Sequence, residues 1–309
     1  MRRYERILVC IDRVERDARM LAYVRAIGRL AESREICLLH VSEVKASGAA
    51  DTSGDSPAPA EITVETLRAL TGEYFEADQE EVCRCEVVHG APLLEVLRFA
   101  HDRDVDLIVV GREFGGPHDA HDEALLARRI TRKSACSVLV LPEEHRVKAD
   151  TILVPVRDSE CSANALEIAC EIGAATEAAV IAFNVYRVHT GYSRVGTTLE
   201  EHQALLEAAA QRECRQLLKR LEGREAEVRC RCAPDHHGKP VSIILEALAS
   251  ESADLVVIGA RGRTGAAGVL LGTVTEQLIR ESPVPVLAVK KKGECLGLLR
   301  ALLTLAGEG

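Results

Sequence analysis

The six residues DLIVVG at positions 106–111 return as DLVVIG at positions 254–259, 148 residues further along the chain. Two more blocks recur at this offset and an apolar block recurs at an offset of 145: HGAP (89–92) as HGKP (237–240), SVLVL (137–141) as PVLAV (285–289), and RILVCID (6–12) as TILVPVR (151–157). Blocks that recur in the same order at nearly one offset indicate a duplicated domain. The chain of 309 residues is therefore expected to hold two copies of one domain of ordinary size.

Within the second copy, short apolar runs alternate with stretches of helical periodicity. We expect strands at 152–156, 179–185, 226–232, 255–258 and 286–289, and helices at 162–173, 199–221, 242–250 and 274–280. Gly173 is expected to end the first of these helices. The alternation predicts an α/β fold with a parallel, doubly wound sheet and helices on both faces. In such sheets, ligands bind outside the carboxyl ends of the strands, where the winding reverses.

The repeat predicts the division of the chain into domains. We expect one domain at residues 1–145, a second at 150–292 and a helical tail at 293–309. The linker between the copies, about Pro142–Asp150, is so short that they are expected to pack as a pseudo-symmetric pair. The stretch Lys45–Glu61, rich in Ser, Gly, Ala and Pro, is expected to be a loop inside the first domain. The leucine-rich tail is expected to dock on the body or on a second subunit of a homodimer.

Composition excludes several classes of protein. Hydrophobic residues make up 47% of the chain and charged residues 28%, as in a soluble globular protein, and the net charge of −9 argues against nucleic acid as a partner. No apolar run reaches the roughly 18 residues that span a bilayer. The first residues, Met1–Arg6, run into an apolar strand without a signal-peptide pattern, so we expect a cytoplasmic protein. The eleven cysteines are then expected to be free thiols.

Glycines at fixed spacing follow the strand at 255–258. Gly259, Gly262 and Gly272 stand in the order G-x2-G-x9-G and are followed by Thr273. Gly259 ends a buried strand where a Cβ would block the approach of a ligand. Gly262 lets backbone N–H groups converge on an anion, and Gly272 with Thr273 opens a helix whose N-terminal amides and dipole favour phosphate. Strand ends in α/β proteins often carry Gly and helices often begin at Thr, but those tendencies do not explain the whole spacing.

These motifs resemble those of the universal stress protein family in its tandem two-domain form. The resemblance covers Arg6 to about Lys292, and its residues in the second copy are ILVPV (152–156), Gly238 with Pro240, DLVVIG (254–259), the spaced glycines with Thr273, VTE (274–276) and PVPVL (283–287). The spaced glycines match in full the ATP-binding pattern G-x2-G-x9-G-[S/T] of that family. The resemblance implies a Rossmann-like, adenine nucleotide alpha hydrolase-like domain in each copy, with a five-stranded parallel sheet.

The resemblance also implies which residues hold ATP, with AMP or ADP as alternatives and Mg²⁺ as a companion ion. The adenine is expected near the ends of the first two strands and the phosphates on the glycine segment; the full set is Pro155, Val156, Val185, Gly259, Arg261, Gly262, Gly272, Thr273, Val274 and Thr275. One position departs from the family, because the acidic residue that usually faces the ribose is here Arg157, followed by Asp158. This departure bears on nucleotide affinity.

The first copy departs further from the ATP-binding pattern. Gly111 matches Gly259, but Phe114, Ala124 and Leu125 stand at the positions of Gly262, Gly272 and Thr273 (all six at the 148-residue offset). Phe114 is expected to fill the space of a phosphate, and Leu125 offers no hydroxyl. Asp12 keeps the acidic position that the second copy has lost. We therefore expect a degenerate first site that serves packing, dimerisation or partner recognition, and one ATP site per chain.

Three other features of the sequence suggest alternative chemistry. Cys83-Arg84-Cys85 and Cys230-Arg231-Cys232 recur in the two copies near histidines, and paired thiols on one strand face could bind zinc or sense oxidants, although C-x-C is not the usual zinc spacing. Asp235-His236-His237 is expected in a loop after the third strand, where histidines are usually solvated. Glu276, one turn into the phosphate-facing helix, could orient water or magnesium, or could simply match the helix dipole.

These observations favour a nucleotide-responsive stress or regulatory protein that binds ATP and acts on an unidentified regulatory protein partner. No catalytic set is recognised in the sequence, so we expect no enzyme. Slow ATP hydrolysis or phosphoryl transfer stays open as the main alternative, and a thiol or zinc sensor as the lesser one.

Overall fold

The structure is a computed structural model of the chain, and it describes residues 3–43, 62–112, 124–188, 199–221, 227–260 and 271–291. The expected loop at 45–61 and the expected tail at 293–309 lie outside these ranges, as do Arg261 and Gly262 of the glycine segment.

Each copy is an alternation of strands and helices. The elements of the first copy are β1 (Arg6–Ile11), α1 (Val14–Ala31), β2 (Glu35–Ser42), α2 (Val64–Tyr74), α3 (Ala77–Glu80), β3 (Cys83–His89), α4 (Pro92–Asp102), β4 (Leu107–Gly111), α5 (Ala124–Lys133) and β5 (Ser137–Leu141). Those of the second copy are β6 (Thr151–Pro155), α6 (Glu160–Thr176), β7 (Ala179–Arg187), α7 (Leu199–Lys219), β8 (Val228–Asp235), α8 (Pro240–Ser250), β9 (Leu255–Gly259), α9 (Thr273–Glu281) and β10 (Val286–Val289).

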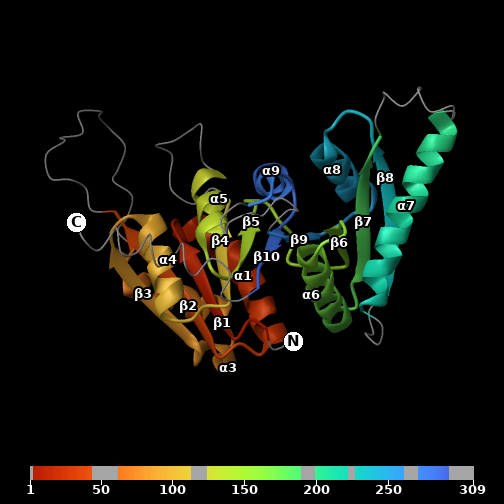
Figure 1. Ribbon diagram of the computed structural model, residues 1–309. Coiled ribbons are helices and arrows are strands. Elements are labelled where there is room, and N and C mark those ends of the chain that lie inside the picture. Colours follow the sequence, from red (N-terminus) through yellow and green to blue (C-terminus); the bar gives the residue numbers. More distant parts are fainter. Residues whose placement is uncertain are drawn as a thin grey trace, which may run out of the picture.

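The ten strands form one continuous sheet in the order β3-β2-β1-β4-β5-β10-β9-β6-β7-β8 (Figure 1). All neighbours within a copy are parallel, whereas β5 and β10 meet antiparallel at the seam between the copies. At this seam Leu139 pairs with Leu287, its own counterpart at the 148-residue offset. The copies are therefore related by an approximate two-fold axis that passes between these two residues.

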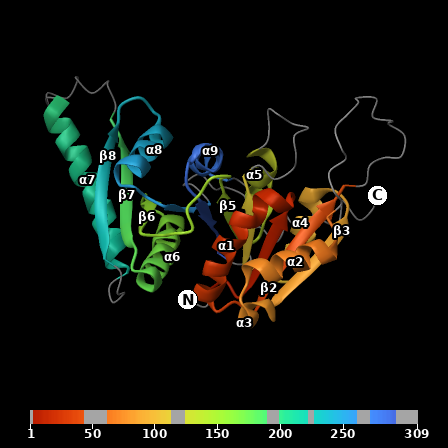
Figure 2. The same ribbon diagram turned by 180° about the vertical axis from the view of Figure 1, so that it is seen from behind.

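Helices cover both faces of the sheet, because strands buried on both sides leave apolar side chains on each face. One core cluster joins the sheet to α1, α2, α6 and α7, and a second joins its other face to α4, α5, α8 and α9. Figure 2 shows the molecule from behind, where helices α1 and α2 of the first group lie over the strands of the first copy. The predicted α/β fold, with a Rossmann-like parallel sheet in each of two tandem copies, is confirmed.

The prediction that Gly173 ends a helix is wrong. Helix α6 continues to Thr176, and Glu177, in the left-handed region at φ 59°, ends it by donating its N–H to the carbonyl of Gly173. Gly173 is buried inside the helix, where an added Cβ would lie 2.8 Å from Val180 Cγ2 and 2.9 Å from the carbonyl oxygen of Ala178. The glycine therefore permits close packing of the helix on the returning chain, which local sequence does not reveal.

Among the residues that the structure describes, no helix combines the length and the apolar character that crossing a membrane requires.

Candidate functional site

The winding of the second copy reverses between two neighbouring strands, β6 and β9. From β6 the chain continues to β7 on one side, whereas from β9 it continues to β10 on the other side. The register Leu153↔Val256 brings the end of β9, at Gly259, level with Val156 just after β6. The two carboxyl ends thus form the crevice in which open α/β sheets bind ligands. The sequence-predicted residues on β6 and β9 come together here.

Gly259 is buried against the first turn of α6. An added Cβ at this position would lie 2.7 Å from both Cβ and the carbonyl oxygen of Cys161. Real Cβ atoms do not approach backbone so closely, so a side chain here would push strand and helix apart. Gly259 therefore allows β9 to pack closely against α6 at the edge of the crevice.

The N-terminus of α9 is tied to the end of β9 by two hydrogen bonds. The N–H of Gly272 donates to the carbonyl of Ala260 at 3.0 Å, and the hydroxyl of Thr275 donates to the carbonyl of Gly259 at 3.2 Å. Thr275 is buried, so its hydroxyl positions the helix, whereas Thr273 is exposed and Val274 is half-buried. The first N–H groups of a helix have no acceptor within it. The first turn of α9 therefore presents amide donors and a positive dipole end beside the crevice.

The strand ends next to the crevice supply apolar walls. Val156 and Val185 are buried, Pro155 is half-buried, and the N–H of Val156 donates to the carbonyl of Phe183 at 2.9 Å. Arg157 and Asp158 are both exposed, and the backbone N–H of Arg157 donates to the hydroxyl of Ser162 at 3.0 Å. The side chains of Arg157 and Asp158 thus project into solvent beside the strand ends.

Asp235 organises the third strand end at this edge, and sequence reasoning missed its role. Strand β8 extends to Asp235, so this residue does not lie in a loop as expected, while His236 and His237 are exposed. The buried Asp235 carboxylate accepts hydrogen bonds from the backbone N–H groups of His237 at 3.1 Å and Lys239 at 3.0 Å. Burial raises its pKa, but these bonds and the nearby Arg187 outweigh burial and lower the pKa below its ordinary value.

This arrangement shapes the turn before α8. Gly238 has φ +71°, and an added Cβ would lie 3.1 Å from the guanidinium of Arg187. The Asp235 carboxylate therefore holds a tight turn and is committed to backbone donors, which leaves it unsuited to proton transfer. An Asp followed three residues later by Gly is the signal that could have predicted this role, because Asp side chains commonly accept from the backbone two residues on.

A model of the Universal stress protein family matches residues 3–142 and matches again at residues 148–290. The chain belongs to the universal stress protein family.

Individual relatives agree with this assignment. A universal stress protein of Methanocaldococcus jannaschii is 31% identical over 141 residues, which cover 45% of this chain and 81% of that protein. A universal stress protein structure from Archaeoglobus fulgidus covers 93% of this chain and 96% of its own, with a TM-score of 0.56 and 18% identity. A functionally unknown protein from Pseudomonas aeruginosa covers 99% and 98%, with a TM-score of 0.66 and 17% identity. The two structures show that the whole two-copy fold recurs in known proteins.

In this universal stress protein, the first copy presents a different set of groups at the equivalent strand end. Gly111 is followed by Arg112, whose N–H donates to the carbonyl of Leu141 at 2.8 Å. Phe114 and the side chains of Ala124 and Leu125 lie outside the described residues, so the expected blockage by Phe114 stays a prediction. The Arg112 side chain reaches across the seam to the second copy.

Glu276, the acid that could have oriented water or magnesium, has a partner from the first copy. The guanidinium of Arg132 on α5 contacts its Oε1 through two nitrogens, and the Nε–Oε1 distance is 3.2 Å. The alternatives considered for Glu276 from sequence did not include this ion pair, because the two residues are 144 positions apart.

The two Cys-Arg-Cys strands carry half-buried thiols. Burial raises the pKa of Cys83 to about 12 and that of Cys232 to about 11, whereas the interaction with the neighbouring Cys214 thiol lowers the pKa of Cys230. Within the described ranges, no three His, Cys, Asp or Glu side chains gather in a way that could hold a metal ion. Nothing in that part of the chain favours the zinc-sensor alternative.

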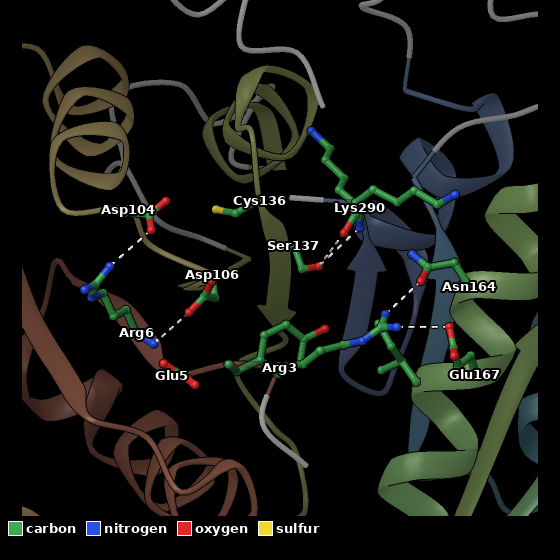
Figure 3. A pocket seen from close by; sticks show the side chains of 13 residues that line it. Arg3, Glu5, Arg6, Asp104, Asp106, Cys136, Ser137, Asn164, Glu167 and Lys290 are labelled. Atoms are coloured by element: carbon green, nitrogen blue, oxygen red, sulfur yellow. Dashed lines mark hydrogen bonds and ion pairs between the residues drawn. The ribbon is translucent and has the colours of Figure 1, made fainter. Parts of the chain in front are cut away.

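A separate cavity of about 730 Å³ opens at the seam between the copies (Figure 3). Arg3 donates across the seam to Asn164 at 2.8 Å and to Glu167 at 3.0 Å, and Arg6 donates to Asp104 within the first copy at 3.1 Å. None of the described ATP-binding candidates lines it. The cavity and the crevice at β6 and β9 are thus distinct features.

Proposed function

We propose that this universal stress protein binds adenine nucleotide, with ATP as the first candidate, in the crevice between the carboxyl ends of β6 and β9. The observation that carries the proposal is the start of α9, tied beside Gly259 at the point where the winding of the sheet reverses. Amide donors and a helix dipole at such a point favour phosphate. The complete glycine pattern from Gly259 to Thr273 supports the same assignment.

The proposed contacts follow from the part that each residue plays at this edge. The first-turn N–H groups of Thr273 and Val274 bind phosphate together with Arg261 and Gly262, while Pro155, Val156 and Val185 form the apolar side of the adenine site. Gly259 and Thr275 act by holding β9, α6 and α9 together. Mg²⁺ accompanies the polyphosphate, and the first copy binds no nucleotide.

The proposed role is regulatory. Nucleotide occupancy would bias a surface that a regulatory protein partner, or a second copy of this chain, recognises, and a ligand can do so only through different affinities for two states. Glu276 is paired with Arg132, so the acid at the phosphate-facing turn is not free to act as a base. This pairing favours binding over hydrolysis.

Isothermal titration of the purified protein with ATP, ADP, AMP and cAMP, each with and without Mg²⁺, tests the proposal. At Gly272 the backbone (φ −66°, ψ 140°) suits any residue, so Gly272→Val should keep the fold and lower affinity at least tenfold, about 1.4 kcal/mol, by crowding the phosphate. Gly72→Val on the exposed side of α2 is the control and should bind as the unaltered protein does. Absence of binding by any nucleotide would refute the proposal, and steady phosphate release that Gly272→Val abolishes would replace it with the ATPase alternative.

A further inference from the structure

Helix α9 is in contact with the first copy at both of its ends. Helices α5 and α9 lie side by side over the seam in both views (Figures 1 and 2). In the first turn of α9, Glu276 pairs with Arg132 of α5, and both side chains are partly shielded from solvent. At the other end, Arg112 Nη1 donates to the carbonyl oxygens of Ser282 at 2.8 Å and Arg280 at 3.5 Å.

The contact at the C-terminal end has a counterpart across the two-fold axis. Lys290 at the end of β10 donates its Nζ to the carbonyls that end α5, including that of Ser134 at 2.7 Å and that of Thr131. Ser134 and Ser282 are equivalent at the 148-residue offset. Each copy therefore supplies a basic side chain that caps the last helix of the other copy, where the carbonyl ends of a helix attract a cation.

Arg112 stands in the segment of the first copy that lacks the full glycine pattern. Arg112 directly follows Gly111 and corresponds to Ala260, the residue at the start of the glycine segment in the second copy. In the first copy this strand end therefore carries a long cationic side chain that is used at the seam instead of an open approach to phosphate.

Such contacts matter for α9 because the helix is short. With nine residues it is below the length at which an isolated helix is stable, so its position depends on packing. A carboxylate in its first turn would also repel a bound phosphate, and the Arg132 guanidinium offsets that charge. The direction in which the first-turn amides point, and the potential around them, both depend on side chains from the first copy.

We propose that the first copy positions the phosphate-facing helix of the second copy through Arg112 and Arg132, so that nucleotide affinity is linked to the seam between the copies. The link to affinity rests on the proposed nucleotide site, whereas the restraint on α9 does not. By thermodynamic reciprocity, a nucleotide bound at α9 stabilises the seam by the same factor by which the seam strengthens nucleotide binding.

Hydrogen exchange and titration of the full chain test the two parts separately. Without nucleotide, Arg112→Ala and Arg132→Gln should each raise amide exchange within residues 273–281 about three- to tenfold, and each should weaken ATP binding by a similar factor. In Arg132→Glu the loss should be larger, and adding Glu276→Arg should restore protection because the pair is re-formed in reverse. Circular dichroism checks that every variant is folded.

Arg3→Ala is the matched control. It removes seam contacts to Asn164 and Glu167 on α6 without touching α9, and should leave both α9 exchange and ATP affinity unchanged. Unchanged α9 exchange in both arginine variants would overturn the positioning role, as would an equal effect of Arg3→Ala. If exchange rises while ATP affinity stays the same, the link to affinity is wrong. If the unaltered protein binds no nucleotide, the proposed function fails, and the exchange experiment still decides the role of the arginines.

Discussion

At the scale of single residues, Asp235 gives a pH-dependent prediction. Its carboxylate accepts from two backbone N–H groups, and its pKa in the folded protein is below the value of about 3.9 expected when unfolded. The unfolded chain then binds a proton more readily, so the stability that Asp235 contributes is fully present above about pH 4 and is lost as the pH falls through the folded pKa.

The substitution Asp235→Asn should therefore lower the free energy of unfolding by about 1–3 kcal/mol at pH 7, because charge-assisted bonds to the backbone are weakened. Urea denaturation at pH 7 and at pH 3 measures this, and the difference between the two proteins should shrink at the lower pH. Asp158→Asn, at an exposed position, is the control and should change stability by less than about 0.5 kcal/mol. A penalty for Asp235→Asn that is the same at both pH values would show that charge has no part in holding the turn.

At the scale of elements, the contact of β9 with α6 depends on Gly259. An added Cβ would lie 2.7 Å from Cys161 atoms that include the backbone oxygen, which cannot rotate away. Gly259→Ala should lower the free energy of unfolding by about 1–3 kcal/mol, as overpacking of a close contact does. Thermal denaturation measures the change.

The control for this prediction is Gly72→Ala in α2, where the nearest atom to an added Cβ is Glu80 Oε1 at 3.9 Å. Alanine favours helix over glycine, so this variant should be more stable by up to about 1 kcal/mol. A Gly259→Ala protein as stable as the unaltered one would mean that β9 and α6 do not approach as closely as the structure indicates.

Element boundaries illustrate what local sequence can predict. The strand expected at 286–289 has those bounds in the structure, because a short apolar run that follows turn residues is a local signal. The helix that was expected to stop at Gly173 continues to Thr176. The glycine is needed there because Val180 and the backbone of Ala178 pack too closely for a side chain. A residue chosen for its tertiary neighbours carries no local signal.

At the scale of the whole molecule, the continuous sheet predicts cooperative unfolding. Both core clusters contain residues of both copies, and β5 and β10 share an antiparallel ladder at the seam. Neither copy can unfold without exposing apolar surface of the other. We therefore expect a single transition in scanning calorimetry, with equal calorimetric and van't Hoff enthalpies. Two resolved transitions would show that the copies are stable as independent domains.

The two copies and the doubly wound fold of each could be predicted from the sequence alone, and with them the strand ends at which we propose that a ligand binds. Recurrence, periodicity and glycine spacing are local properties, and the parallel α/β topology then follows from general rules of handedness and winding. Gly259, at the carboxyl end of β9, could be placed at the crevice for this reason. Pro155 and Val156 at the neighbouring strand end were expected from the family resemblance.

The way in which the copies join is visible only in three dimensions. The contacts that join the copies link residues more than 140 positions apart. They are the pairing of Leu139 with Leu287, the helix caps made by Arg112 and Lys290, and the ion pair of Arg132 with Glu276. These contacts form only when the two folded domains pack together. In the sequence, an arginine that faces solvent cannot be distinguished from one that caps a helix end. Side-chain partners across a seam are set by three-dimensional geometry, which is why α9 was predicted as a helix while the side chains that hold it were not.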